Sequence, residues 1–60
     1  MTENTEHKIL EVLETEPKGM AALLVAKKLR LSLVEVIQTL EALVQQGKIK
    51  KKGKIYRAVS

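Results

Sequence analysis

The sequence predicts a small α+β domain in which three short helices are followed by a C-terminal β-hairpin of two strands. Apolar residues recur at helical spacing through most of the chain, Pro17 and Gly47 interrupt that spacing, and residues 48–59 change to the composition of β-strands. With 60 residues, the chain has room for one domain. We therefore take residues 1–60 as a single domain, with residues 1–4 frayed and residues 48–59 forming the hairpin.

The first helix is expected to follow the frayed residues 1–4. Asn4 or Thr5 can cap its N-terminus. Pro17 stops it, because proline pushes the preceding residue out of helical geometry. The apolar stripe of this helix consists of Ile9, Leu10 and Leu13.

A second helix is predicted from Met20 to Arg30. One narrow apolar face of it carries Ala22, Val25, Ala26 and Leu29. Three further apolar residues lie off that face, namely Met20, Leu23 and Leu24. They form either a dimer or partner surface, since contiguous exposed apolar side chains usually mark an interface, or part of the packing under the hairpin or against the first helix. We favour packing, because a small domain uses most of its apolar residues in the core.

The third helix has the clearest boundaries in the sequence. Ser32 and Glu35 have the spacing of a capping box, in which each side chain satisfies a free backbone amide at the start of the helix. Gly47 ends the helix, since glycine readily adopts the left-handed conformation found there. The apolar residues within about 60° of one line on the wheel are Leu33, Val36, Ile37, Leu40, Leu43 and Val44.

The hairpin is predicted as strands 48–51 and 54–59 around a Lys52–Gly53 turn. Its register stays open, because a slip of one residue would exchange Ile55 and Tyr56 between core and solvent. The helices and the hairpin share a predicted core of Ile9, Leu10, Leu13, Val25, Leu29, Val36, Leu40, Leu43 and Ile49.

Charge is distributed very unevenly along the chain. Residues 1–17 hold five glutamates and one lysine, a net charge of −4, and residues 18–60 hold ten lysines and arginines against two glutamates, a net charge of +8. This asymmetry indicates one face for a polyanion and another turned away from it. The alternative is ordinary solubility charge.

Composition excludes several classes of function. The chain has no cysteine and one histidine, His7, so we expect no metal site, no disulfide and no cofactor. No serine–histidine–acid arrangement or phosphate-cradling glycine motif is present, so we expect no enzyme. The longest apolar run, residues 20–26, is too short to span a membrane, and the polar, acidic start does not resemble a signal peptide. We expect a cytoplasmic protein, associated with the nucleoid if bacterial or archaeal.

The segment Val25–Ser32 (VAKKLRLS) resembles the helix-turn-helix core of bacterial winged-helix repressors of the ArsR and MarR types. In those families a leucine–alanine pair, a leucine three residues on and a short turn ending in serine recur. Arg30 departs from the pattern, because glycine is frequent at that place. The similarity continues through Val36, Leu40 and Leu43 to Gly47-Lys48-Ile49. This resemblance implies a winged helix-turn-helix fold and binding to DNA.

The closing segment Ile55–Ser60 (IYRAVS) is similar to the last strand of the Zα domains, which are compact winged helices that bind left-handed DNA. Tyr56 stands near the position of their stacking tryptophan. The positions that carry asparagine and tyrosine in Zα domains are Ile37 and Glu41 here, and the paired prolines of their wing are missing. The resemblance therefore supports the fold and does not extend to specificity for left-handed DNA.

In a winged helix the third helix usually enters the major groove and the hairpin contacts the backbone or the minor groove. The predicted base-contacting residues of the third helix are Ser32, Glu35, Gln38 and Thr39, with Gln38 first because glutamine pairs with adenine through two hydrogen bonds. The third helix itself contains no lysine or arginine. The predicted phosphate-binding residues, expected to form a cationic surface beside it, are Lys27, Lys28, Arg30, Lys48, Lys50, Lys51, Lys52, Lys54 and Arg57.

The leading hypothesis is a nucleic-acid-binding module for double-stranded DNA, acting in transcription regulation or a related DNA transaction. The rival is a winged helix that binds a partner protein, or a second copy of itself through Met20, Leu23 and Leu24, and binds no nucleic acid. RNA binding is a weaker third hypothesis, because the single aromatic residue, Tyr56, offers little for stacking on unpaired bases.

Overall fold

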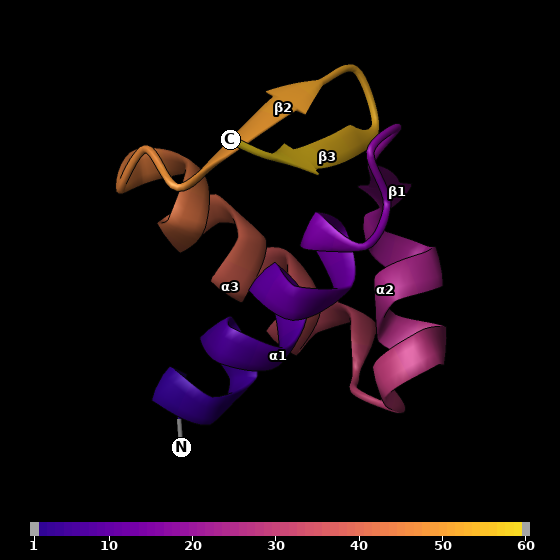
Figure 1. Cartoon of the computed structure of the whole chain (residues 1–60). Helices are drawn as coiled ribbons and strands as arrows, with labels where there is room; N and C mark the ends of the chain where they lie inside the picture. The colour runs from indigo at the N-terminus through magenta and orange to yellow at the C-terminus, as the bar shows by residue number, and fades with distance from the viewer. Residues whose placement is uncertain (1, 60) are drawn as a thin grey trace.

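The computed structural model describes the backbone of residues 2–59 and the side chains of residues 5–59. It confirms the predicted fold class of three helices and a C-terminal β-hairpin, and adds a short strand between the first two helices (Figure 1). The elements in chain order are α1 (Thr2–Glu14), β1 (Met20–Ala21), α2 (Ala22–Leu29), α3 (Leu33–Gln45), β2 (Ile49–Lys52) and β3 (Ile55–Ala58).

The molecule has two layers, with the antiparallel sheet lying over the ends of the three helices (Figure 1). The strand order is β1-β3-β2, so β3 is central and β1 and β2 are the edges. One face of the sheet covers the helices and the other is turned away from them. This arrangement exposes the outer face of the hairpin to solvent.

The core lies between the helices and the inner face of the sheet. Seven of the nine predicted core residues are buried, while Leu10 and Leu29 are partly buried and packed against them. Ala26 and Tyr56 complete the buried apolar set. Burial of Tyr56 decides the register of the hairpin, because Ile55 is then on the solvent side, where it is 38% exposed.

α1 begins earlier than the sequence predicts. Residues 2–4, expected to be frayed, are helical, and the predicted cap at Asn4 or Thr5 was wrong; residue 1, also predicted to be frayed, lies outside the described residues. A cap contributes only about 1 kcal/mol, so packing can override it. Thr5 is buried, and its hydroxyl donates a hydrogen bond to the Glu35 carboxylate at 3.5 Å. This contact joins the first turns of α1 to the start of α3.

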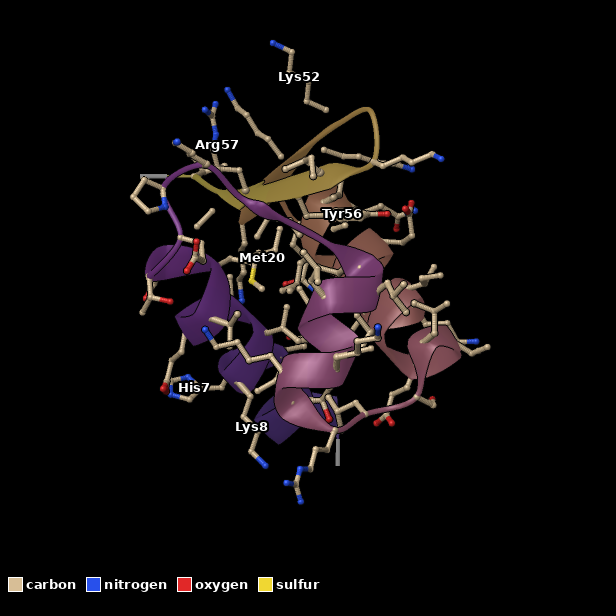
Figure 2. All side chains as sticks on the ribbon, turned by 90° about the vertical axis from the view of Figure 1, so that its right-hand side faces the viewer. His7, Lys8, Met20, Lys52, Tyr56 and Arg57 are labelled. Carbon is tan, nitrogen blue, oxygen red and sulfur yellow. The ribbon has the colours of Figure 1, made fainter. Side chains whose placement is uncertain are left out.

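The predicted second helix was two residues too long at its N-terminus. Met20 and Ala21 form β1 and pair with Tyr56 and Ile55 of the central strand. Met20 is partly buried and packs against the core, pointing into the interior beneath the sheet (Figure 2). Met20 is therefore part of the packing, and the alternative prediction that it belongs to an exposed interface was wrong.

α3 has the boundaries that its sequence predicts. The Ser32 hydroxyl oxygen accepts a hydrogen bond from the Glu35 N–H at 3.1 Å. At the other end, the Gly47 N–H donates to the Val44 carbonyl and the Lys48 N–H donates to the Leu43 carbonyl, both at 3.0 Å. These two bonds form a Schellman motif, which requires the left-handed Gly47 (φ +78).

α2 ends in the same way, but with an arginine in the left-handed position. Arg30 has φ 59 and ψ 42, and the Leu31 N–H donates to the Ala26 carbonyl at 3.0 Å. The turn thus has the geometry that glycine would favour. Arginine there bears the steric penalty of a Cβ atom, about 1–2 kcal/mol for an L-residue.

The variant Arg30→Gly is expected to raise the free energy of unfolding by about 0.5–1 kcal/mol, since relief of that penalty exceeds the added chain entropy of glycine. Urea denaturation followed by circular dichroism measures it. The matched control is Lys28→Gly, which lies within α2 and is expected to lose about 1 kcal/mol. Equal destabilisation of both variants would show that Arg30 carries no conformational penalty.

The hairpin turn lies one residue later than predicted. Gly53 and Lys54 form the turn, and the cross-strand pairs are Ile49 with Ala58, Lys50 with Arg57, Lys51 with Tyr56, and Lys52 with Ile55. Because successive side chains alternate across a strand, two of these pairs face the helices and two face outward. The inward pairs contain Ile49 and Tyr56, and the outward pairs are Lys50 with Arg57 and Lys52 with Ile55.

Candidate nucleic-acid interface

The outer side of α3 presents only part of the predicted base-contacting set. Gln38, Glu35 and Ser32 are exposed, so their side chains are accessible to a ligand. Thr39 is 6% exposed, and its hydroxyl donates to the Glu35 backbone carbonyl at 2.9 Å. The prediction that Thr39 faces a ligand was therefore wrong, because it lies on the buried side of the helix.

Apolar side chains occupy much of the exposed surface of α3. Val34 is 66% exposed, and Leu33 and Ile37, which the wheel placed toward the core, are 41% and 40% exposed. The predicted stripe was too wide at its margins, and its buried members are Val36, Leu40 and Leu43. Together with the lack of lysine and arginine in α3, this leaves an exposed helix surface that is apolar, polar and acidic, with no cation of its own.

The junction of α3 with the hairpin contains a three-residue cluster that the sequence did not predict. The Tyr56 hydroxyl donates to the Glu41 carboxylate at 3.2 Å, and the Lys51 ammonium lies 3.6 Å from the same carboxylate oxygen. The ammonium also lies 5.6 Å from the centroid of the Tyr56 ring. The cluster ties the hairpin to α3.

The cluster also sets the charge of this junction. The phenol of Tyr56 and, second, the carboxylate of Glu41 raise the pKa of the Lys51 ammonium above its usual 10.5, so it stays protonated at physiological pH. Its positive charge is offset by the paired Glu41. The one hairpin lysine of β2 that faces the helices therefore adds little net charge beside α3.

The hairpin also carries a cationic surface. An open groove of about 550 Å³ is lined by Lys18, Lys50, Lys51, Lys52, Ile55 and Arg57. Of these, Lys51 pairs with Tyr56 on the side of the helices, and Lys50, Lys52, Ile55 and Arg57 belong to the outward pairs. Lys52 and Arg57 point away from the helices, whereas Tyr56 lies beneath the sheet (Figure 2). Among the described residues, the ion pairs join His7 to Glu11 and Lys51 to Glu41, so the other cations of this groove form no ion pair within 4.0 Å. Glu14 and Glu16 line a neighbouring pocket together with Lys50 and Arg57.

The predicted phosphate-binding residues are all exposed, but they are divided among several places. Lys27, Lys28 and Arg30 lie at the C-terminal end of α2, and Lys48 follows α3. Lys54 is in the hairpin turn. On the two hairpin strands, Lys51 faces the helices, and the cations of the outer face are Lys50, Lys52 and Arg57. The register assigns Lys50 and Lys52 to the outer face of the hairpin and Lys51 to the inner face. The sequence does not make this assignment, because the three consecutive lysines are chemically identical.

Other candidate sites are less developed. Leu23 and Leu24 are 51% and 53% exposed, so the packing favoured for them was wrong, and the alternative of a dimer or partner surface stays a prediction for these two residues. Within residues 5–59, no group of three histidine, acidic or cysteine side chains could hold a metal ion. No described helix has the length and hydropathy needed to cross a membrane.

Comparison with known proteins supports the fold and gives a family. Residues 6–57 match the family described as the C-terminus of the ethanolamine utilization protein EutK. The structure superposes with a TM-score of 0.90 on a solved chain from a study titled "The binding mode of Cyprinid Herpesvirus3 ORF112-Zalpha to Z-DNA", with 24% identity over 98% of both chains. No curated protein sequence matches the chain. The superposition confirms the winged-helix architecture.

Proposed function

The chain belongs to the family of ethanolamine utilization protein EutK C-termini, and we propose that it is a nucleic-acid-binding module whose partner is double-stranded DNA. The observation that carries this proposal is a set of exposed cations at the two ends of α3 and in the hairpin turn. None of them has an ion-pair partner among the described residues; they are Lys27, Lys28, Arg30, Lys48 and Lys54. A polyanion supplies the missing negative charge. The superposed Zalpha domain, whose study concerns binding to Z-DNA, is a winged helix of the same architecture and supports the proposal.

The proposed mode places α3 in the major groove and the hairpin turn on the backbone of the same duplex. Gln38 is the principal base contact, since its exposed amide can donate and accept hydrogen bonds with adenine. Val34 and Ile37, exposed on α3, can contact thymine methyl groups. Phosphate contacts come from outside α3, which contains no cation of its own.

A module of this kind acts by binding, and the proposal assigns no chemical step to it. Its biological setting is transcription regulation or a related DNA transaction connected with ethanolamine utilization, the process named by the family. For such a role we propose a cytoplasmic location, associated with the nucleoid if the protein is bacterial or archaeal.

The test is a titration of the 60-residue chain with a labelled random-sequence duplex at several salt concentrations. Neutralisation of about four to five phosphates gives a slope of about −4 for log affinity against log salt concentration. The variant Lys54→Ala, in the hairpin turn, is expected to make this slope shallower by about 1. Gln38→Ala is the matched control, because it removes a neutral side chain and should leave the slope on random sequence unchanged.

Two results would contradict the proposal. Affinity that does not change between low and moderate salt would rule out a backbone interaction of this kind. Absence of duplex binding at low salt would favour a partner protein instead, and the exposed Leu23 and Leu24 would then be the first surface to examine.

A further inference from the structure

We propose that the outer face of the hairpin is a second phosphate-binding surface, which holds a nucleic-acid segment separate from the one that contacts α3. The surface consists of the residues that line the hairpin groove other than Lys51, which is paired with Glu41; they are Lys18, Lys50, Lys52 and Arg57 around Ile55. This inference rests on the proposed function and extends it, because it makes one domain a bridge between two segments of nucleic acid.

The first observation is a pair of like charges placed directly opposite each other. Lys50 and Arg57 are cross-strand partners, and both face outward. Like charges at such positions destabilise a sheet. Glu14 and Glu16 line a pocket with Lys50 and Arg57, but among the described residues no acidic side chain forms an ion pair with either cation. A bound anion would convert this repulsion into attraction to a shared ligand.

Protection of a sheet edge explains only part of this pattern. Lysines on an exposed edge strand prevent pairing with other chains, and β2 is such an edge. Arg57, however, is on β3, which is paired on both sides and needs no protection. Lys18 is not on a strand at all and still lines the groove. The cations share a groove, not an edge.

The outer face is also distinct from the surface of α3. The sheet lies between them, with Tyr56 filling the inner side and bonded to Glu41 of α3 (Figure 2). Lys52 and Arg57 point in the opposite direction. A nucleic-acid segment bound on the outer face therefore leaves Gln38 accessible to a second nucleic-acid segment.

The lining of the groove favours a phosphate backbone over an acidic protein segment. Lys50 and Lys52 lie two residues apart on one strand, about 7 Å, and Arg57 offers a planar group that can bind two phosphate oxygens at once. Apart from Ile55, the groove offers no apolar side chain that could recognise a particular protein. Repeated charge with little else is suited to sequence-independent backbone contact.

The experiment uses two short duplexes, one labelled with a donor fluorophore and one with an acceptor, mixed with the 60-residue chain at about 100 mM salt. Wild type is expected to bring the two labels together, with a limiting stoichiometry of two duplexes per domain. The variant Arg57→Glu is expected to lower the energy-transfer signal about tenfold or more. Its affinity for a single duplex at α3 should change less than about threefold, because Arg57 points away from the helices and salt at this concentration screens exposed charges over about 10 Å.

The variant Arg57→Glu should fold, since the new carboxylate would face Lys50 and turn a repulsive pair into an attractive one. The matched control is Lys8→Glu, an exposed residue of α1 whose substitution changes the net charge by the same amount. It is expected to keep both bridging and affinity.

Distinct outcomes overturn the two proposals. Wild type that binds one duplex per domain without energy transfer, or Arg57→Glu that still bridges, overturns the second surface and leaves DNA binding at α3 intact. Binding of a polyglutamate peptide or of anionic vesicles that competes with bridging and depends on Arg57, at lower concentration than duplex, assigns the surface to another partner and also overturns it. Failure of wild type to bind any duplex overturns the proposed function itself.

Discussion

The variant Gly19→Ala is expected to lose about 2–5 kcal/mol of unfolding free energy, combining the left-handed penalty with overpacking. Gly19 has φ +85, and an added Cβ atom would lie 2.6 Å from Cγ2 of Ile55 and 2.6 Å from the carbonyl oxygen of Tyr56. The second contact is with the backbone of the central strand, which cannot move without breaking the sheet. A domain of this size has roughly 3–9 kcal/mol of stability in total, so the variant should lose a large part of it. Urea denaturation followed by far-ultraviolet circular dichroism measures the loss.

Two other glycines separate the contribution of conformation from that of close packing. Gly47 and Gly53 also have positive φ, +78 and +62, but an added Cβ would meet no atom within 4 Å at either position. Gly47→Ala and Gly53→Ala are therefore expected to lose only about 1–2 kcal/mol each. If Gly19→Ala is no less stable than these two variants, the approach of β1 to β3 does not require glycine.

The sequence predicts the helices well because their signals are local. The hydroxyl of Ser32 and the backbone of Gly47 act within a few residues of themselves, and both ends of α3 lie where these residues place them. β1 is the opposite case. Met20 and Ala21 continue the apolar run of α2, and only their pairing with β3, far along the chain, makes them a strand.

Helix faces are predicted less well at their margins. Ile37 and Thr39 lie at the two sides of the buried stripe of α3, and the wheel alone does not show which margin the neighbouring helices cover. In the structure Thr39 is covered and Ile37 is not. One predicted base-contacting residue is thereby removed, and one apolar residue is added to the exposed surface.

The candidate site depends most on the hairpin register. Moving the turn from Lys52–Gly53 to Gly53–Lys54 changes the cross-strand partner of Arg57 from Lys48 to Lys50, and burial of Tyr56 turns the face of this pair to solvent. The total charge of the hairpin could thus be predicted, but its direction could not. The contact of Lys51 with Glu41 was equally out of reach, because the two residues lie on different elements and only the fold brings them together.

The variant Glu41→Gln is expected to bind random-sequence duplex about tenfold more tightly at about 100 mM salt, with a salt slope steeper by about 1. Glu41 places a negative charge on the exposed side of α3 and holds the ammonium of Lys51 at 3.6 Å. Removing the negative charge of Glu41 ends its repulsion of phosphate and leaves the Lys51 ammonium free to contact the phosphate backbone of the duplex. The glutamine can still accept the hydrogen bond of Tyr56, so folding should lose no more than about 1 kcal/mol. Binding is measured by fluorescence anisotropy.

Glu11→Gln is the control, since it removes one exposed glutamate of α1 and changes the net charge equally. It should leave the affinity and the slope within error of wild type. An equal gain in both variants would mean that only net charge matters and that the Lys51–Glu41–Tyr56 cluster does not face the duplex. A gain confined to Glu41→Gln would show that the cluster limits backbone affinity at α3, so that discrimination there depends on Gln38 and its apolar neighbours rather than on charge.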